Sequence, residues 1–206
     1  LGVSKRRIQE IILEMKRISL IDGEEKISST RKGDDLFHSF KNGNLENIHN
    51  ILFKNSSHYQ KFIKTMENHT DERGLKKNEI LEKISASEDL LEFNKTSVSL
   101  LTDWGERLNS IQRNVYQNRF YSILNPREMN FNRILEDEYA NLEETESLYL
   151  SKRYISLPEI RERICEKMRI SRDDFDNRLI NTYMGNIGKM ELSGAPLNTQ
   201  AKQSKL

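Results

Sequence analysis

The chain has 206 residues, with 33 Lys or Arg, 32 Asp or Glu, a formal net charge of +1, one Cys and three Pro. The single Cys excludes a disulfide framework and a zinc site built from cysteines. No apolar run approaches the ~20 residues of a membrane-spanning helix, and the first residues do not show a basic-then-apolar signal pattern, so we expect no signal segment. We therefore expect a cytoplasmic protein with no membrane partner. Because the chain begins at Leu1 rather than Met, we also expect a fragment of a longer protein.

Residues 1–68 are predicted to contain a helix, a small hairpin and further helices. Ser4 is a suitable N-cap, and the helix predicted over 4–21 has one apolar stripe at helical spacing, formed by Ile8, Ile11, Ile12, Met15 and Ile18. Asp22-Gly23 indicates a turn between two short strands. A second helix follows Thr30, and helical spacing continues over 44–67.

Residues 72–125 are predicted to form a second unit after a linker over 68–78, where the apolar pattern breaks. Helical spacing returns near Ile80, and a helix is expected from 96 to 109 with Leu101 and Trp104 in the core. The polar centre 116–119 lies between β-prone flanks, which predicts a hairpin.

The last third divides into an acidic connector and a third unit. Six carboxylates between 136 and 146 share their segment with helically spaced apolar residues, so we expect an acidic connecting helix over 127–150. Residues 151–196 are expected to hold a helix with a capping box at Ser156 and another helix capped by Ser171. The polar tail 197–206 is expected to be disordered. The predicted fold class is mainly α with short β-hairpins.

Three times the chain shows a helix, a sharp turn, a capped amphipathic helix and then a hairpin or strand. The first copy keeps only the end of this order, with Leu1-Gly2-Val3-Ser4 as the turn and 20–29 as the hairpin; the second runs from Asn94 to Tyr121 and the third from Ser156 to Leu192. This order resembles the winged helix-turn-helix family. The resemblance implies tandem winged-helix units joined by helical connectors, the first truncated at its amino terminus.

The family commonly places the second helix of the motif in the DNA major groove and the wing on the backbone or minor groove. Carried onto this chain, the resemblance implies DNA contacts at Lys5, Arg6, Arg7, Gln9 and Lys26 in the first unit, and at Lys95, Thr96, Ser97, Arg113, Tyr116, Gln117 and Arg119 in the second. Arg and Gln can pair with base edges, and Lys with phosphates. In the third unit Asp173, Asp174 and Asp176 would repel phosphates, so that unit is expected to bind protein or to use other basic residues.

The alternative for Lys5-Arg6-Arg7 is a helix start that is solvated and binds no ligand. However, cations at a helix amino terminus oppose the helix dipole by about 0.3–1 kcal/mol each unless an anion compensates. For Arg113, Tyr116 and Arg119 the alternative is an ordinary polar hairpin.

Catalytic motifs are absent from the sequence. It has no Gly-rich phosphate loop, nucleophile elbow or dinucleotide fingerprint, and its four histidines lack ligand spacing. We expect no enzyme, cofactor or metal. The expected function is double-stranded DNA binding, as a transcription regulator or as the recognition part of a larger antiviral defence or replication complex. The alternative is a protein-interaction scaffold, docking through the third unit or as a homodimer.

Overall fold

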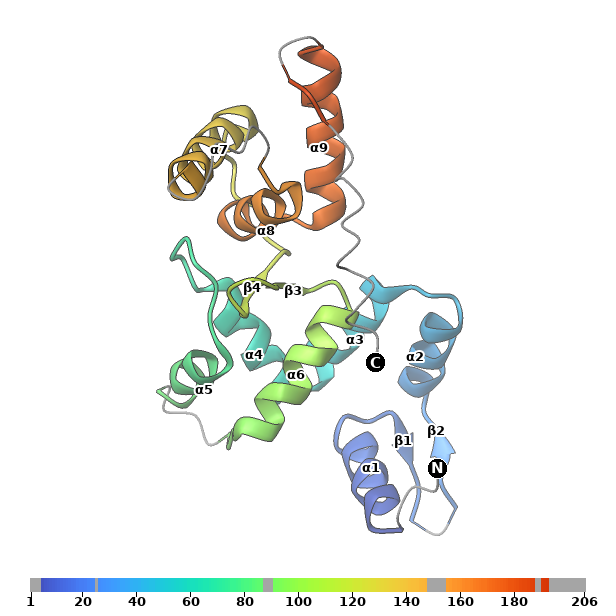
Figure 1. Ribbon diagram of the computed structural model, residues 1–206. Coiled ribbons are helices and arrows are strands. Elements are labelled where there is room, and N and C mark those ends of the chain that lie inside the picture. Colours follow the sequence, from blue (N-terminus) through green and yellow to red (C-terminus); the bar gives the residue numbers. More distant parts are fainter. Residues whose placement is uncertain (1–4, 25, 87–90, 148–154, 188–189, 193–206) are drawn as a thin grey trace, which may run out of the picture.

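The computed structural model describes residues 5–24, 26–86, 91–147, 155–187 and 190–192, apart from the side chains of residues 6, 7, 10 and 145–147. Within these residues the protein is mainly helical, with two small antiparallel hairpins (Figure 1), which confirms the predicted fold class. The elements are α1 (Lys5–Arg17), β1 (Ile21–Asp22), β2 (Ser28–Ser29), α2 (Arg31–Lys41), α3 (Leu45–Asn55), α4 (Ser57–Glu67), α5 (Lys77–Ser85), α6 (Lys95–Arg107), β3 (Ile111–Asn114), β4 (Arg119–Ser122), α7 (Phe131–Ser147), α8 (Leu157–Met168) and α9 (Arg172–Gly185).

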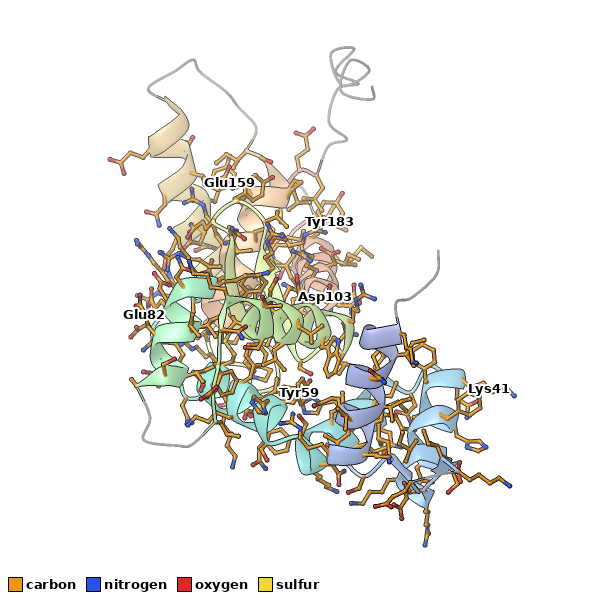
Figure 2. All side chains as sticks on the ribbon, turned by 90° about the horizontal axis from the view of Figure 1, so that it is seen from below. Lys41, Tyr59, Glu82, Asp103, Glu159 and Tyr183 are labelled. Carbon is orange, nitrogen blue, oxygen red and sulfur yellow. The ribbon has the colours of Figure 1, made fainter. Side chains whose placement is uncertain are left out.

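The first helix and hairpin lie at one end of the molecule, together with α2 (Figures 1 and 2). β1 pairs antiparallel with β2, with Ile21 opposite Ser29, close to the predicted strands. The Thr30 side chain caps α2 by accepting a hydrogen bond from the Gly33 N–H at 3.1 Å, as such residues do at helix starts. The expected turn at residues 1–4 lies outside the described residues.

The centre of the molecule consists of α4, α5 and α6 packed around the β3–β4 hairpin. Tyr59, Phe62 and Ile80 are completely buried there, and α6 buries Val98 and Leu101. These aromatic and aliphatic side chains account for the cohesion of the region, because apolar area removed from water is the main favourable term in folding.

The segment over 68–76 is not the free linker that its composition indicates. Leu75 forms an antiparallel bridge with Phe120 of β4, with both N–H···O bonds at 2.8 Å. Gly74 is required at this approach, because a Cβ atom there would lie 2.5 Å from the Phe120 carbonyl oxygen. Arg127 and Arg169 donate to backbone carbonyls of the same segment. These hydrogen bonds fix the connection in place by pairing its backbone groups with residues distant in sequence.

The carboxyl-terminal region contains the predicted acidic helix, α7, and the pair α8 and α9. Ser171 caps α9 as expected, accepting from the Asp174 N–H at 3.1 Å. The capping box at Ser156 is wrong: Ser156 holds the N-cap position, but its side chain accepts no hydrogen bond. Pro158 in the first turn removes one N–H donor, and the Glu159 carboxylate instead accepts from Arg163 at 2.8 Å.

The β3–β4 hairpin lies between two apolar clusters. Phe120 of β4 belongs to the cluster that includes Ile18, Ile48 and Phe62, whereas the adjacent Tyr121 belongs to the cluster of α7, α8 and α9. Successive strand residues point to opposite faces, so one hairpin serves both clusters. The first cluster also runs without a break across the predicted border between the first and second units, at residues 68–72.

Candidate nucleic-acid interface

The start of α1 presents the first group of predicted DNA contacts. Lys5 and Gln9 are exposed, and the first turn contains no Asp or Glu. Lys26, in the turn between β1 and β2, is also exposed. The side chains of Arg6 and Arg7 lie outside the described part of the chain. An uncompensated positive charge at a helix amino terminus, where backbone N–H groups are unpaired, favours an anion.

The start of α6 has the same character, with a better defined cap. The Asn94 side chain accepts from the Ser97 N–H at 2.9 Å, while the Ser97 hydroxyl accepts from the Asn94 N–H. Ser97, a predicted contact, is therefore engaged within the helix cap. Lys95 and Thr96 are exposed, and again the first turn has no carboxylate.

The hairpin divides its four predicted contacts into two pairs. Arg119 donates to the Gly74 carbonyl at 2.9 Å and lies 3.8 Å from the Glu79 carboxylate. The Arg113 guanidinium lies over the Phe120 ring, with 5.9 Å from its Cζ to the ring centroid. Both arginines are half-buried and have intramolecular roles. Tyr116 and Gln117, at the tip, are exposed.

Two lysines of the predicted linker lie beside this hairpin. Lys76 and Lys77 are exposed at the start of α5. The Lys77 ammonium donates to the Ser99 hydroxyl at 2.9 Å and lies 5.6 Å from the centre of the Phe120 ring. An adjacent lysine pair before a helical pattern is a sequence signal for a basic helix start. Lys76 and Lys77 were not predicted as contacts because residues 68–78 were expected to be a linker.

The start of α9 has the opposite charge. Asp173 and Asp174 occupy its first turn, and Asp174 pairs with Arg178 at 3.0 Å. Arg161 of α8, a basic residue that this region could use instead of the start of α9, lies 3.4 Å from Asp176. The cations described in this region are largely neutralised by their own neighbours, in keeping with the expectation that α9 does not face DNA.

The helices α1 and α2 each leave apolar side chains exposed. Ile8 and Ile11 of α1 are 46% and 44% exposed, and Phe37 and Phe40 of α2 are 65% and 77% exposed. The apolar stripe predicted for the first helix is thus only partly covered, since Ile18 at its end is buried. We call these four residues the open apolar faces of α1 and α2. Exposed apolar surface of this kind is typical of interaction sites.

One buried polar cluster has the atoms of a nucleophile and a base. The Ser110 hydroxyl lies 2.7 Å from His49 Nδ1, and both contact the Tyr59 hydroxyl, at 3.0 and 2.9 Å. Ser110 and Tyr59 are completely buried, which denies a substrate access to the hydroxyl. Burial lowers the pKa of His49 and raises the pKa of Tyr59 to about 12. The cluster therefore serves to join α3 and α4 to the turn before β3.

The remaining chemistry-bearing groups of the described residues form no recognisable site. Cys165 is buried, and burial raises its thiol pKa to about 12, which leaves it protonated and unreactive. No group of three His, Cys, Asp or Glu within this part of the chain is placed to hold a metal ion. No helix found there is both long and apolar enough to span a membrane.

Comparison of the chain with protein-family models, with curated proteins and with solved structures gives no match.

Proposed function

We propose that this protein is a non-enzymatic, cytoplasmic protein that binds double-stranded DNA through the starts of α1 and α6. The observation that carries the proposal is the charge at three corresponding helix starts. α1 and α6 begin with exposed lysines and no carboxylate, whereas α9 begins with Asp173 and Asp174. The first two can accept a phosphate, and the third would repel it.

The arrangement of elements supports the resemblance to winged helices. α5, the capped helix α6 and the β3–β4 hairpin follow one another in the expected order, and α1 with β1 and β2 repeats the end of that order. Within this proposal Lys5, Lys26 and Lys95 neutralise phosphates, and Gln9 and Thr96 lie near base edges. The biological role would be transcription regulation or DNA recognition within a larger defence or replication complex.

The test is the affinity for a labelled duplex of Lys95→Glu, compared with Lys64→Glu. Both lysines are exposed, and Lys64 lies in the last turn of α4 rather than at a helix start. We expect Lys95→Glu to weaken binding about tenfold or more, because it places a carboxylate where a phosphate should bind, and Lys64→Glu to change it less than about twofold. Equal effects of the two variants would contradict the proposal.

A second candidate function is protein docking, which the open apolar faces of α1 and α2 favour. Partners commonly cover exposed aliphatic and aromatic side chains of this size. Light scattering together with duplex binding separates the two functions. A monomer that binds duplex supports DNA recognition. Self-association that Phe40→Ser abolishes, in a protein that does not bind duplex, supports docking.

A further inference from the structure

The turn between β3 and β4 is exposed to solvent, yet its backbone is firmly held. The Asn114 side-chain oxygen accepts hydrogen bonds from the Tyr116 and Gln117 N–H groups, at 3.0 and 3.1 Å. The Asn118 N–H donates to the Asn114 carbonyl at 2.8 Å, and Asn118 takes the left-handed conformation, with φ of 53°. Asn114 thus fixes the shape of the turn through both its side chain and its main-chain carbonyl.

Two buried carboxylates of α8 in turn hold Asn114 and its neighbour. Glu166 accepts from the Asn114 side-chain amide at 2.5 Å through one oxygen and from the Gly74 N–H at 2.5 Å through the other. Glu162 accepts from the Val115 N–H at 3.1 Å. These glutamates lie one helical turn apart and are 2% and 4% exposed, with Glu162 the more buried.

Arg172 completes this anchorage from the start of α9. Its guanidinium donates to Glu162 at 2.5 and 2.8 Å and to the Arg113 carbonyl at 2.8 Å. Hydrogen bonds from Arg172 and Val115 lower the pKa of Glu162 against the effect of burial, so the carboxylate is charged when the hairpin is held.

Stability alone does not explain this anchorage. A buried ion pair seldom stabilises more than apolar residues of equal volume, because both charges lose their water. The segment that it fixes displays Val115 and Tyr116, which are 57% and 56% exposed and gain little from folding. Rigidity in an exposed aromatic turn favours ligand binding, because the turn loses little further conformational entropy when a ligand binds to it.

The resemblance already implies DNA contacts at Tyr116 and Gln117 in this turn. We propose that Glu162 and Glu166 of α8 are the positioning residues that preform the turn of Val115, Tyr116 and Gln117 for the DNA duplex. This rests on the proposed function. The carboxyl-terminal region then takes part in binding without touching DNA, because α8 sets the direction of the turn. Tyr116 packs on the sugar–phosphate edge of the duplex, and Gln117 donates a hydrogen bond to that edge. Such contacts tolerate many base sequences.

An exchange of hydrogen-bonding groups tests the positioning role. In Glu166→Gln, an amide donor meets the Asn114 amide; in Asn114→Asp, two carboxylates face each other. In the double variant, the introduced amide can still accept from the Gly74 N–H through its oxygen, and its nitrogen can donate to the introduced carboxylate, whose other oxygen can accept from the turn. We expect each single variant to weaken duplex binding by up to about tenfold, and the double variant to return within about twofold of the original affinity.

Charge alone predicts a different pattern. Glu166→Gln removes a negative charge and would tighten binding to DNA, so weakening by this variant marks positioning. Amide exchange at Tyr116 and Gln117 should rise in the single variants and fall again in the double variant, with the unfolding midpoint followed in parallel.

Tyr116→Ala keeps the proposal falsifiable even where a buried substitution prevents folding, because Tyr116 is exposed. Duplex binding that Tyr116→Ala leaves unchanged overturns this inference but not the proposed function. Weakening by Tyr116→Ala without weakening by folded single variants overturns the positioning role. Failure of the unaltered protein to bind any duplex is the failure of the proposed function itself.

Discussion

Two helices that precede hairpins, α1 and α6, have similar sequence patterns and very different surroundings. α6 packs against α4, α5 and β3 and buries Val98 and Leu101. The main partner of α1 is β1, and Ile8 and Ile11 remain open. An apolar stripe therefore predicts a helix correctly in both places, but it does not reveal whether the molecule supplies the surface that covers it.

The two hairpins differ in the same way. β3–β4 lies between two apolar clusters, and α8 carboxylates anchor its turn. β1–β2 contains a two-residue pair in which Ser28 and Ser29 are exposed. An isolated hairpin is marginally stable in water. The β3–β4 hairpin therefore gains its fixed shape from the apolar clusters on both of its sides.

The largest difference between the two helices should appear in stability. Leu101→Ala is expected to lower the free energy of unfolding by about 2–5 kcal/mol, because it leaves a cavity in the core. Ile11→Ala is expected to lower it by less than about 1 kcal/mol, since Ile11 is already in contact with water. Urea unfolding measures both. Equal losses would mean that α1 is covered in solution.

The anchorage of the second hairpin should give a smaller effect. Arg172→Ala leaves the buried Glu162 without its cation, and we expect a loss of about 1–3 kcal/mol in unfolding free energy. The matched control is Arg107→Ala, which removes an exposed pair with Asp103 at 3.1 Å and should cost about 0.3–0.5 kcal/mol. A loss for Arg172→Ala no larger than the control's would refute the anchorage.

DNA affinity compares the helix starts directly. Lys5→Ala and Lys95→Ala each remove one phosphate contact, so we expect several-fold weaker duplex binding from each, and a product of the two effects in the double variant. Fluorescence anisotropy at one fixed salt concentration measures this. If only Lys95→Ala weakens binding, the first unit has no part in the interface.

The smallest expected effect is on the pH dependence of stability. Burial lowers the pKa of His49 and His69 in the folded protein. The unfolded chain therefore binds protons that the folded protein does not, and stability that is present above the ordinary histidine pKa of about 6.5 is lost as the pH falls through it. His49→Gln should flatten this dependence between neutral and mildly acidic pH, compared with the unaltered protein. Identical pH profiles would contradict this.

Local signals predicted the elements well. Apolar spacing indicated α1, α6 and α7, Ser171 indicated the start of α9, and the polar centre at 116–119 indicated the hairpin. These features depend on residues close together in the chain, where propensity and capping act.

The anchoring residues could not be predicted in this way. In α8, Ile160 and Ile164 form one stripe, whereas Glu162 and Glu166 project from nearly the opposite side and would ordinarily be solvated. They are buried because the hairpin packs there. Likewise, the composition of 68–76 indicates a linker. Only its bridge to Phe120 and the hydrogen bonds from Arg127 and Arg169, which are distant in sequence, show otherwise.

The most direct test of the account is the salt dependence of duplex binding, measured for the unaltered protein and for the Lys5→Ala, Lys95→Ala double variant. We predict that the logarithm of the association constant falls linearly with the logarithm of salt concentration, and that the double variant has a shallower slope by about two phosphate contacts. A flat line for the unaltered protein, or the same slope for both proteins, would contradict the claim that these two helix starts bind DNA.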